Sequence, residues 1–414
     1  MMKRPIAIDL FSGCGGMSLG LEASGFDVTV AVEFDAIHAL IHHLNFPYTS
    51  TICEDINNLK TDYLKDILKQ KKVDNDIDLI AGGPPCQGFS LMGKRQLDDP
   101  RNSLVFEYFR VIKDLKPKYF IFENVPGIAV GKHQQFLAEL ITEFENIGYR
   151  IAKPFKILDA SLFGAPQKRK RLILMGSRND VKPVNYPLEI QEFNNVESAI
   201  ADLSSIPAFI GENKGINSKK LDYSGFRSNF ALNSQGIYKF CHHRQRDHFI
   251  YNHVGSNHTD KSIERFLSTP QGNIEKTSRF LKLSPTGLCN TLRAGTARDK
   301  GAYTAARPIH YSQPRCITVR EAARLHTFPD WFLFHETIWH GFREIGNAVI
   351  PMLAKAIGDE IIKVLEVDIN QLEVTKLEKV EPKFMEYNMD KASNYWNISN
   401  NIIPKRKRLE MNLL

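Results

Sequence analysis

The sequence counts 414 residues, of which 43% are hydrophobic and 24% are charged, and its net charge is +7. A chain of this length exceeds one compact core, so two domains are predicted, and the composition is that of a soluble globular protein. No apolar run is long enough to span a membrane, the first residues lack the apolar core of a signal peptide, and the six cysteines form no C-x-x-C pair. These features exclude a membrane protein, a disulfide framework and a zinc site, and we expect a cytoplasmic protein without a metal.

The positive charge is concentrated in one internal region. Residues 213–315 contain 17 Lys and Arg against 6 Asp and Glu, which gives this region a charge of +11 and leaves −4 for the rest of the chain. This distribution predicts a region that binds a polyanion, set into a mildly acidic enzyme. On charge alone, a solvated loop region with solubilising lysines is an alternative.

The chain begins with a pattern typical of a nucleotide-type pocket. Residues 6–11 (IAIDLF) predict a buried strand, residues 12–16 (SGCGG) form a glycine loop, and a helical period resumes at Met17. Strand, glycine loop and helix open such a pocket in doubly wound α/β sheets. Ser18 occupies the last position of the G-x-G-x-x-G pattern, which weakens the case for a dinucleotide pyrophosphate.

Acidic residues follow the next two predicted strands. The strand 28–32 ends at Glu33, which lies 20 residues beyond Gly13. An acid at this spacing suits two ribose hydroxyls, because a carboxylate accepts both hydrogen bonds. A third short strand leads to Asp55 and Ile56, which suit an adenine amino group and the adenine ring respectively, although acids are also common in turns.

One cysteine stands on a stiff turn after a fourth strand. Residues 77–81 (IDLIA) predict this strand, and residues 81–90 (AGGPPCQGFS) place Cys86 behind two prolines. A thiol held at a strand end is well placed to act as a nucleophile. By itself, Cys86 is equally compatible with a small buried thiol. A helix is predicted from Ser103 to about Leu115.

A carboxylate follows the fifth strand. Residues 119–122 (YFIF) predict a buried strand that ends at Glu123, so Cys86 and Glu123 come after consecutive strands. The carboxyl ends of parallel strands lie at one edge of an open α/β sheet, where ligands bind. We therefore expect the thiol and the carboxylate to face one substrate.

A run of basic residues precedes a sixth strand, residues 172–175. If the run is extended, Gln167, Arg169 and Arg171 share one face, since side chains alternate along a strand. A solvated charge run is the alternative, but the apolar strand that follows favours inward-pointing arginines.

From about residue 180 the alternation of strands and helices fades into an irregular, loop-rich region. Regularity returns with a capped helix at 318–325 and a last amphipathic helix that opens at Gly346 and runs to about 367. Residues 368–414 form a polar tail, interpreted as a loosely docked or disordered extension.

Six of these segments resemble, in the same order, the motifs of the DNA (cytosine-5) methyltransferase family. The resemblance implies an α/β fold with a doubly wound, mostly parallel, Rossmann-like sheet and a second, smaller, loop-rich target recognition domain. It places the catalytic domain in residues 1–180 and 336–367, the recognition domain in 181–335 and a tail in 368–414. The segments are residues 11–16 (FSGCGG), 83–87 (GPPCQ), 123–125 (ENV), 167–171 (QKRKR), 320–325 (REAARL) and 346–347 (GN).

The resemblance also implies the cofactor, S-adenosylmethionine, and three sets of site residues. The catalytic set is Cys86, Glu123, Arg171 and Arg169. The DNA-binding set is Gln87, Ser90, Gln167, Thr291, Leu292 and Arg293. The cofactor-binding set is Phe11, Gly13, Cys14, Gly15, Gly16, Glu33, Asp55, Ile56, Pro85, Leu104, Asn347 and Ala348.

The implied chemistry is methylation at carbon 5 of a cytosine. The thiolate of Cys86 attacks carbon 6, and Arg171 holds the carbonyl oxygen at position 2. Glu123, if protonated or sharing a proton with ring nitrogen 3, offsets the negative charge that develops on the ring. The cytosine is flipped out of duplex DNA. We expect a monomeric bacterial modification enzyme that works in the cytoplasm at the nucleoid, beside a cognate restriction endonuclease acting on the same site without stable contact.

Three alternatives remain at this point. The first is an RNA (tRNA) cytosine-5 methyltransferase built on the same catalytic motifs, which the large basic region disfavours. The second is a nicotinamide-dependent dehydrogenase, which gives Cys86 no role. The third is a non-catalytic DNA-binding protein with a degenerate pocket, although every chemically required residue type is present.

Overall fold

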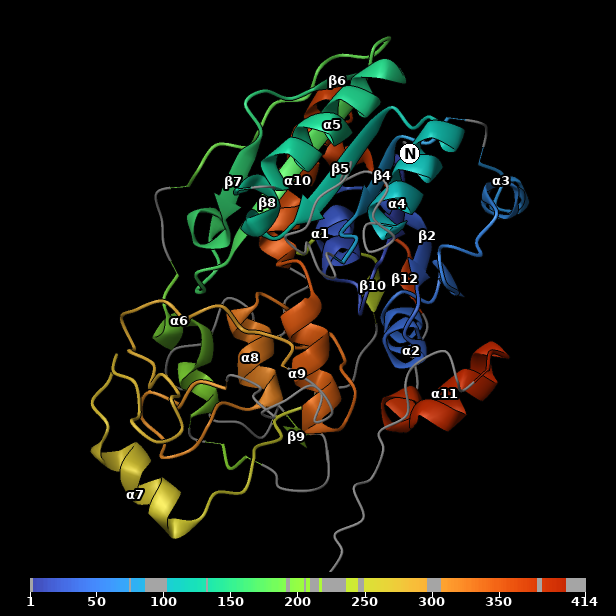
Figure 1. Ribbon diagram of the computed structural model, residues 1–414. Helices are drawn as coiled ribbons and strands as arrows, with labels where there is room; N and C mark the ends of the chain where they lie inside the picture. Colours follow the sequence, from blue (N-terminus) through green and yellow to red (C-terminus); the bar gives the residue numbers. More distant parts are fainter. Residues whose placement is uncertain are drawn as a thin grey trace, which may run out of the picture.

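The structure is a computed structural model of the whole chain. A sheet covered by helices occupies the upper part of the molecule in Figure 1, and a second, loop-rich part lies below it. No helix in the described part of the chain is long and apolar enough to cross a bilayer. The structure describes residues 3–73, 76–85, 103–131, 133–190, 194–204, 206–208, 216–217, 236–244, 249–295, 307–377 and 382–399.

The main sheet has eight strands, and five of them run parallel. The chain order reverses between β1 and β4, which leaves a crevice at the carboxyl ends of these strands. β8 pairs antiparallel with β5, and it carries β6 and β7, also antiparallel. The order is β3 (Ser50–Cys53), β2 (Asp27–Glu33), β1 (Ile6–Leu10), β4 (Leu79–Gly82), β5 (Tyr119–Asn124), β8 (Lys170–Arg178) and β6 (Tyr149–Ile151), with β7 (Lys156–Asp159) on β8.

Helices cover both faces of the sheet, because alternate residues of each strand point to opposite faces. On β5, Phe120 and Phe122 pack against one set of helices, and Tyr119 and Ile121 against the other. The predicted doubly wound, mostly parallel α/β sheet is therefore confirmed. One face carries α3 (Thr61–Gln70), α4 (Ser103–Leu115) and α5 (His133–Asn146), and the other carries α1 (Gly16–Ser24) and α10 (Pro351–Val364).

The lower part is built from short helices and loops. The predicted capped helix is α8, whose N-cap Thr318 accepts a hydrogen bond from the Glu321 amide in a capping box. Arg320 and Arg324 of α8 are fully buried, and Arg324 pairs with Asp330. The elements here are α6 (Val196–Ile200), α7 (Asp260–Ser268), α8 (Val319–Leu325) and α9 (Ile338–Asn347), with the strand pair β9 (Ile216–Asn217) and β11 (Phe249–Ile250). A further pair, β10 (His243–Arg244) and β12 (Lys376–Leu377), follows His242, whose amide donates to Glu22 of α1 at 3.1 Å. The division into domains at residues 180, 335 and 367 stays a prediction.

The predicted start of the last amphipathic helix, at Gly346, is wrong. Gly346 lies near the end of α9, and a new helix, α10, begins at Pro351 after an extended link. Proline disfavours helical backbone in the residue before it, but it fits the first turn of a helix. The predicted helix therefore corresponds to α10 and begins five residues later than expected, while α9 before it was not predicted.

The C-terminal tail also differs from expectation. Within residues 382–399 it forms a short 3-10 turn and a helix, α11 (Met389–Trp396), which packs on α2 (Ala36–Asn45). Met385 and Ala392 are 3% and 0% exposed, so this stretch is docked rather than loose. The composition of the tail is mostly polar, so the sequence did not indicate that its scattered aromatic residues make the contact with α2.

Candidate active site

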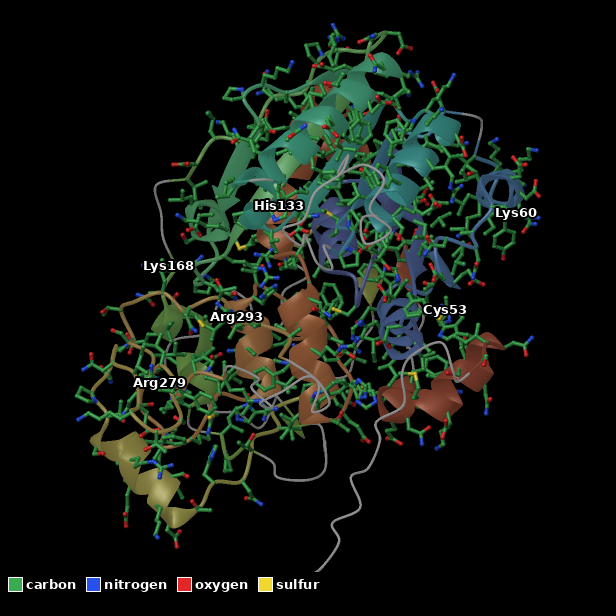
Figure 2. The ribbon with its side chains drawn as sticks, viewed as in Figure 1. Cys53, Lys60, His133, Lys168, Arg279 and Arg293 are labelled. Atoms are coloured by element: carbon green, nitrogen blue, oxygen red, sulfur yellow. The ribbon has the colours of Figure 1, made fainter. Side chains whose placement is uncertain are left out.

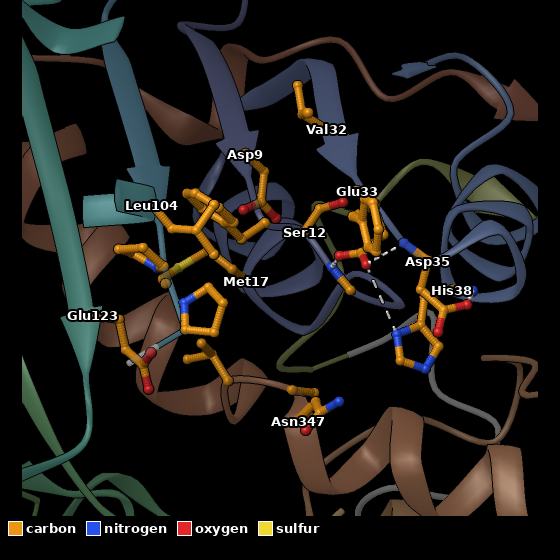
Figure 3. A pocket seen from close by; sticks show the side chains of 18 of the residues that line it. Asp9, Ser12, Met17, Val32, Glu33, Asp35, His38, Leu104, Glu123 and Asn347 are labelled. Carbon is orange, nitrogen blue, oxygen red and sulfur yellow. Dashed lines mark hydrogen bonds and ion pairs between the residues drawn. The ribbon is translucent and has the colours of Figure 1, made fainter. Parts of the chain in front are cut away.

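A cavity of about 660 Å³ opens where the carboxyl ends of β1, β2, β4 and β5 converge. Figure 3 shows Asp9, Ser12, Glu33, Leu104, Glu123 and Asn347 around it. Its volume is that of a small-molecule site. Nine members of the predicted cofactor-binding set line this cavity: Phe11, Gly13, Glu33, Asp55, Ile56, Pro85, Leu104, Asn347 and Ala348.

The glycine loop shapes the floor of the cavity. Phe11 has φ 60°, a left-handed conformation that is strained for a bulky residue and common at functional sites. A Cβ on Gly16 would lie 2.3 Å from the carbonyl oxygen of Val349. The start of α1 can therefore pack this closely against the backbone at Val349 only because residue 16 is glycine. Cys14, Gly15 and Gly16 do not line the cavity; the structure places them behind it, with Cys14 only 1% exposed.

The carboxylate of Glu33 is held at the end of β2 by two backbone donors. Gly13 N–H donates to Oε2 and Asp35 N–H donates to Oε1, each at 2.8 Å. Each oxygen has another lone pair, so the carboxylate can accept two further hydrogen bonds. Burial raises the pKa of Glu33 to about 7, in spite of the two backbone bonds.

Several lining residues escaped the sequence analysis. Asp35 caps α2 and forms an ion pair with Arg343 of α9, and both side chains line the cavity. His38 lies 4.0 Å from Glu33, and burial lowers its pKa to about 4. Phe34, the aromatic residue directly after the ribose-binding candidate, is 38% exposed on the cavity wall. Its place after Glu33 is the one sequence feature that pointed to it.

The lining residues fit the predicted cofactor. Ser12 lines the cavity, and its buried Oγ has no hydrogen-bond partner within the described part of the chain, as expected of a wall that meets a polar ligand. Carboxylates suit ribose hydroxyls and an amino group, while Phe34 and Ile56 offer apolar surface to a base. In the described residues, no group of His, Cys, Asp and Glu side chains is arranged to bind a metal ion.

The predicted catalytic residues Glu123 and Arg171 meet at the mouth of the cavity. Arg171 Nε lies 2.7 Å from Glu123 Oε1, and the side chains are 14% and 12% exposed. A Cβ on Gly83 would lie 2.7 Å from Glu123 Oε2, so only glycine leaves room for this carboxylate. Asn124 donates to the carbonyl oxygen of Pro84 at 3.1 Å, which anchors the turn leading toward the predicted nucleophile. Cys86, Gln87 and Ser90 lie outside the described residues.

Gln167 and Arg169 are buried, and their side chains hydrogen-bond to the backbone of distant segments. Gln167 is fully buried; its amide accepts from Leu292 N–H and donates to Leu325 O. Arg169 is 2% exposed and donates to the carbonyl oxygens of Leu292, Gly346 and Ala348. Buried polar groups satisfied in this way hold a structure together. Both residues thus hold distant segments together, and Arg169 also lines the cavity and the groove beside it. The DNA contact of Gln167 and the catalytic role of Arg169 stay predictions.

A second groove, of about 560 Å³, adjoins the cavity beside Arg171. The side chains of Lys168, Lys170 and Arg293 at this groove are exposed, and Figure 2 shows Lys168 and Arg293 between the upper and lower parts of the molecule. Thr291 hydroxyl donates to Lys168 O at 2.7 Å, and the side chain of Leu292 is buried. Of the predicted DNA-binding residues, the structure thus brings Thr291 and Arg293 to an open basic surface. The two lysines were not predicted.

Comparisons with known proteins agree over nearly the whole chain. The model of the C-5 cytosine-specific DNA methylase family matches residues 6–363. Type II methyltransferase M.XorII of Xanthomonas oryzae pv. oryzae is 48% identical over 369 residues, which cover 88% of this chain and 86% of that protein. Type II methyltransferase M.DdeI of Desulfomicrobium norvegicum is 33% identical over 386 residues, covering 86% and 88% respectively.

Solved structures show the same fold. A crystal structure described as a DNA modification methyltransferase encoded within an E. coli prophage has a TM-score of 0.72 and 32% identity, and covers 88% of this chain and 100% of that one. The S. pombe Dnmt2 methyltransferase, at 18% identity and a TM-score of 0.55, also covers 88% of this chain and 100% of its own. The second likeness concerns the fold alone.

Proposed function

The chain belongs to the C-5 cytosine-specific DNA methylases, and on this basis we propose that it methylates a cytosine flipped out of duplex DNA through a covalent bond to Cys86. The enzyme is a DNA (cytosine-5) methyltransferase of the type II family. This membership decides against a dehydrogenase and against a protein without catalysis. The observation that carries the proposal is the ion pair of Glu123 and Arg171 at the mouth of the cavity, beside the Pro84-Pro85 turn that leads to Cys86.

The cavity is proposed to hold S-adenosylmethionine, which supplies an electrophilic methyl group when it is bound. Glu33 would accept hydrogen bonds from the two ribose hydroxyls, and Asp55 one from the adenine amino group. Asp55 is oriented for this by its own turn, in which Oδ1 accepts from the Asn57 amide at 2.9 Å. Phe34 and Ile56 would contact the base, and Ser12 Oγ is available to a polar group.

The chain's own groups then activate the cytosine. The thiolate of Cys86 adds to carbon 6, and the electron pair of the broken ring double bond makes carbon 5 nucleophilic. Glu123 hydrogen-bonds ring nitrogen 3, and Arg171 faces the carbonyl oxygen at position 2, where negative charge develops. After methylation, a base removes the proton from carbon 5; the electron pair of that C–H bond re-forms the double bond to carbon 6, and the bond to sulfur breaks to release Cys86 as a thiolate.

The second groove is proposed to bind the DNA backbone. Lys168, Lys170 and Arg293 would pair with phosphates next to the flipped nucleotide, and Thr291 lies on the same surface. These contacts help to offset the unstacking and unpairing of the cytosine, which costs roughly a few kcal/mol. Because such contacts release counterions, DNA binding should weaken as the salt concentration rises.

The biological role is proposed from the relatives' names. They are bacterial type II methyltransferases, so the expected role is modification of a specific duplex site, with a partner endonuclease acting on that site separately. A monomeric enzyme in the bacterial cytoplasm, at the nucleoid, is the corresponding expectation.

Bisulfite sequencing of DNA treated with the purified enzyme tests the proposal, because it reports both activity and target. We expect methylation at carbon 5 of one cytosine within one short sequence. Cys86→Ser is expected to transfer no labelled methyl group while still binding DNA, and transfer by this variant would contradict the covalent mechanism. Transfer to tRNA but not to duplex DNA would favour an RNA substrate instead.

A further inference from the structure

The C-terminal segment, residues 382–399, lies outside the part of the chain that matches the family model, residues 6–363. None of its described residues lines the cofactor cavity. Figure 1 shows its helix α11 beside α2 at the lower right of the molecule. The segment nevertheless contacts two elements that carry cavity residues.

The first of these elements is α2. Trp396 Nε1 donates to the carbonyl oxygen of Ala36, the first residue of α2, at 3.1 Å. The rings of Phe384, Tyr395 and Trp396 surround His43 of the same helix, with centroids 6.1, 5.9 and 5.8 Å away. A directional hydrogen bond and an aromatic cluster together fix the position of α2.

The second element is the chain leading into α9. Glu336 N–H donates to the carbonyl oxygen of Met385, and His335 Nε2–H donates to the carbonyl oxygen of Tyr387, each at 3.0 Å. The amide of His335 in turn donates to Glu344 of α9 at 3.0 Å. The C-terminal segment therefore holds the start of α9 as well as the start of α2.

These two helices meet at the cavity. Asp35, the N-cap of α2, forms an ion pair with Arg343 of α9. The backbone N–H of Asp35 donates to Glu33 Oε1 at 2.8 Å, and so helps to aim the carboxylate. A shift of either helix would disturb the ion pair and, through Asp35, the acceptor proposed for the ribose.

We propose that the C-terminal segment is a positioning element of the cofactor site. It holds α2 and α9 so that Asp35 and Glu33 stand ready before the cofactor arrives. Preorganisation of this kind raises affinity, because less ordering remains to be done on binding. The inference rests on the proposed function, since it takes the cofactor's ribose as the ligand of Glu33.

Calorimetric titration of S-adenosylmethionine into the full-length protein tests this proposal. Trp396→Phe removes the indole donor but keeps an aromatic ring in the cluster, and we expect it to weaken cofactor binding about fivefold, the usual worth of one such hydrogen bond. Trp396→Ala also removes the ring from the cluster around His43, and about a tenfold loss or more is expected. Tyr63→Ala is the control, because Tyr63 belongs to α3, is 52% exposed and lines a surface groove together with Trp396.

A positioning role predicts a raised KM for the cofactor, an unchanged kcat at saturation and unchanged DNA affinity. Equal cofactor affinity in the wild type and both Trp396 variants would overturn it, as would a loss of cofactor and DNA affinity in parallel. If Trp396→Ala does not fold, the cofactor affinity of Trp396→Phe alone decides whether the proposal holds. Failure of the proposed function looks different: the wild type itself then binds no S-adenosylmethionine, and the inference falls with it.

Discussion

Arg171 Nε lies 2.7 Å from Glu123 Oε1, although the two residues belong to different strands. β5 and β8 run antiparallel and pair Glu123 with Ile173, so Arg171 reaches the carboxylate from a diagonal position. Its Nη1 also donates to the Lys170 carbonyl oxygen at 2.7 Å. The carboxylate is thus aimed before any substrate arrives.

Glu123→Gln should slow the reaction without weakening the binding of the cofactor. The variant keeps the shape of the side chain but loses the ion pair with Arg171 and the acidic proton that Glu123 would share with ring nitrogen 3. We expect kcat to fall by about 10²–10⁴, the usual contribution of a positioned acid–base group. Calorimetry should give an unchanged affinity for S-adenosylmethionine. Glu189→Gln, an exposed acid, serves as the control; equal kcat in the two variants would remove Glu123 from the mechanism.

Gly83→Ala should act on the same carboxylate by contact. The added Cβ would lie 2.7 Å from Glu123 Oε2, so the carboxylate must move. Because a displacement of about 1 Å can cost a factor of about 10², we expect a loss of kcat of that order. Gly127→Ala is the matched control, since a Cβ there meets no described atom within 4 Å. Similar rates for the two alanine variants would contradict the close approach.

Cofactor binding should depend on pH through Glu33. Burial raises the pKa of this carboxyl to about 7, and only the ionised form accepts both ribose hydroxyls. Affinity should therefore be fully present well above pH 7 and fall as the pH drops through 7, approaching about tenfold per pH unit on the acidic side. Calorimetry between about pH 6 and pH 8.5 measures this. Glu33→Gln should bind more weakly and without this dependence, whereas a flat wild-type profile would exclude Glu33 as the acceptor.

The two lysines of the second groove should set the salt dependence of DNA binding. If Lys168 and Lys170 each neutralise one phosphate, replacing both by Gln should reduce the slope of log K against log salt by about 2. Lys60→Gln is the control, because Figure 2 shows Lys60 on another side of the molecule. An unchanged slope in the double variant would place the DNA elsewhere.

Much of the sheet-containing part of the molecule could be predicted from the sequence, because short local patterns mark its strands and the residues at their ends. Strands β1 to β5 are short runs with glycine or acidic residues at or soon after their carboxyl ends, so both the strands and these residues could be predicted from the sequence. The carboxyl-edge rule then brought Glu33, Asp55 and Glu123 to one cavity, as the structure shows.

The features that were missed depend on contacts between distant residues. The pair of Asp35 and Arg343 joins residues 308 positions apart, and no local pattern marks it. The burial of Gln167 follows from the segment around Leu292 packing over it, which periodicity along one strand does not reveal. The docking of residues 382–399 depends on scattered aromatic residues that carry no clear period.

The three carbonyl bonds of Arg169 have a consequence for engineering. They join Leu292, in the stretch that leads from the second part of the molecule, to Gly346 and Ala348 beside the cofactor wall. Because all three acceptors are main-chain oxygens, the junction depends on the course of the backbone around residue 292, which a boundary upstream of Cys289 leaves in place. If residues 181–335 read the target sequence as predicted, grafts of loops before Cys289 can change that target while Arg169 and its three acceptors are carried over unchanged.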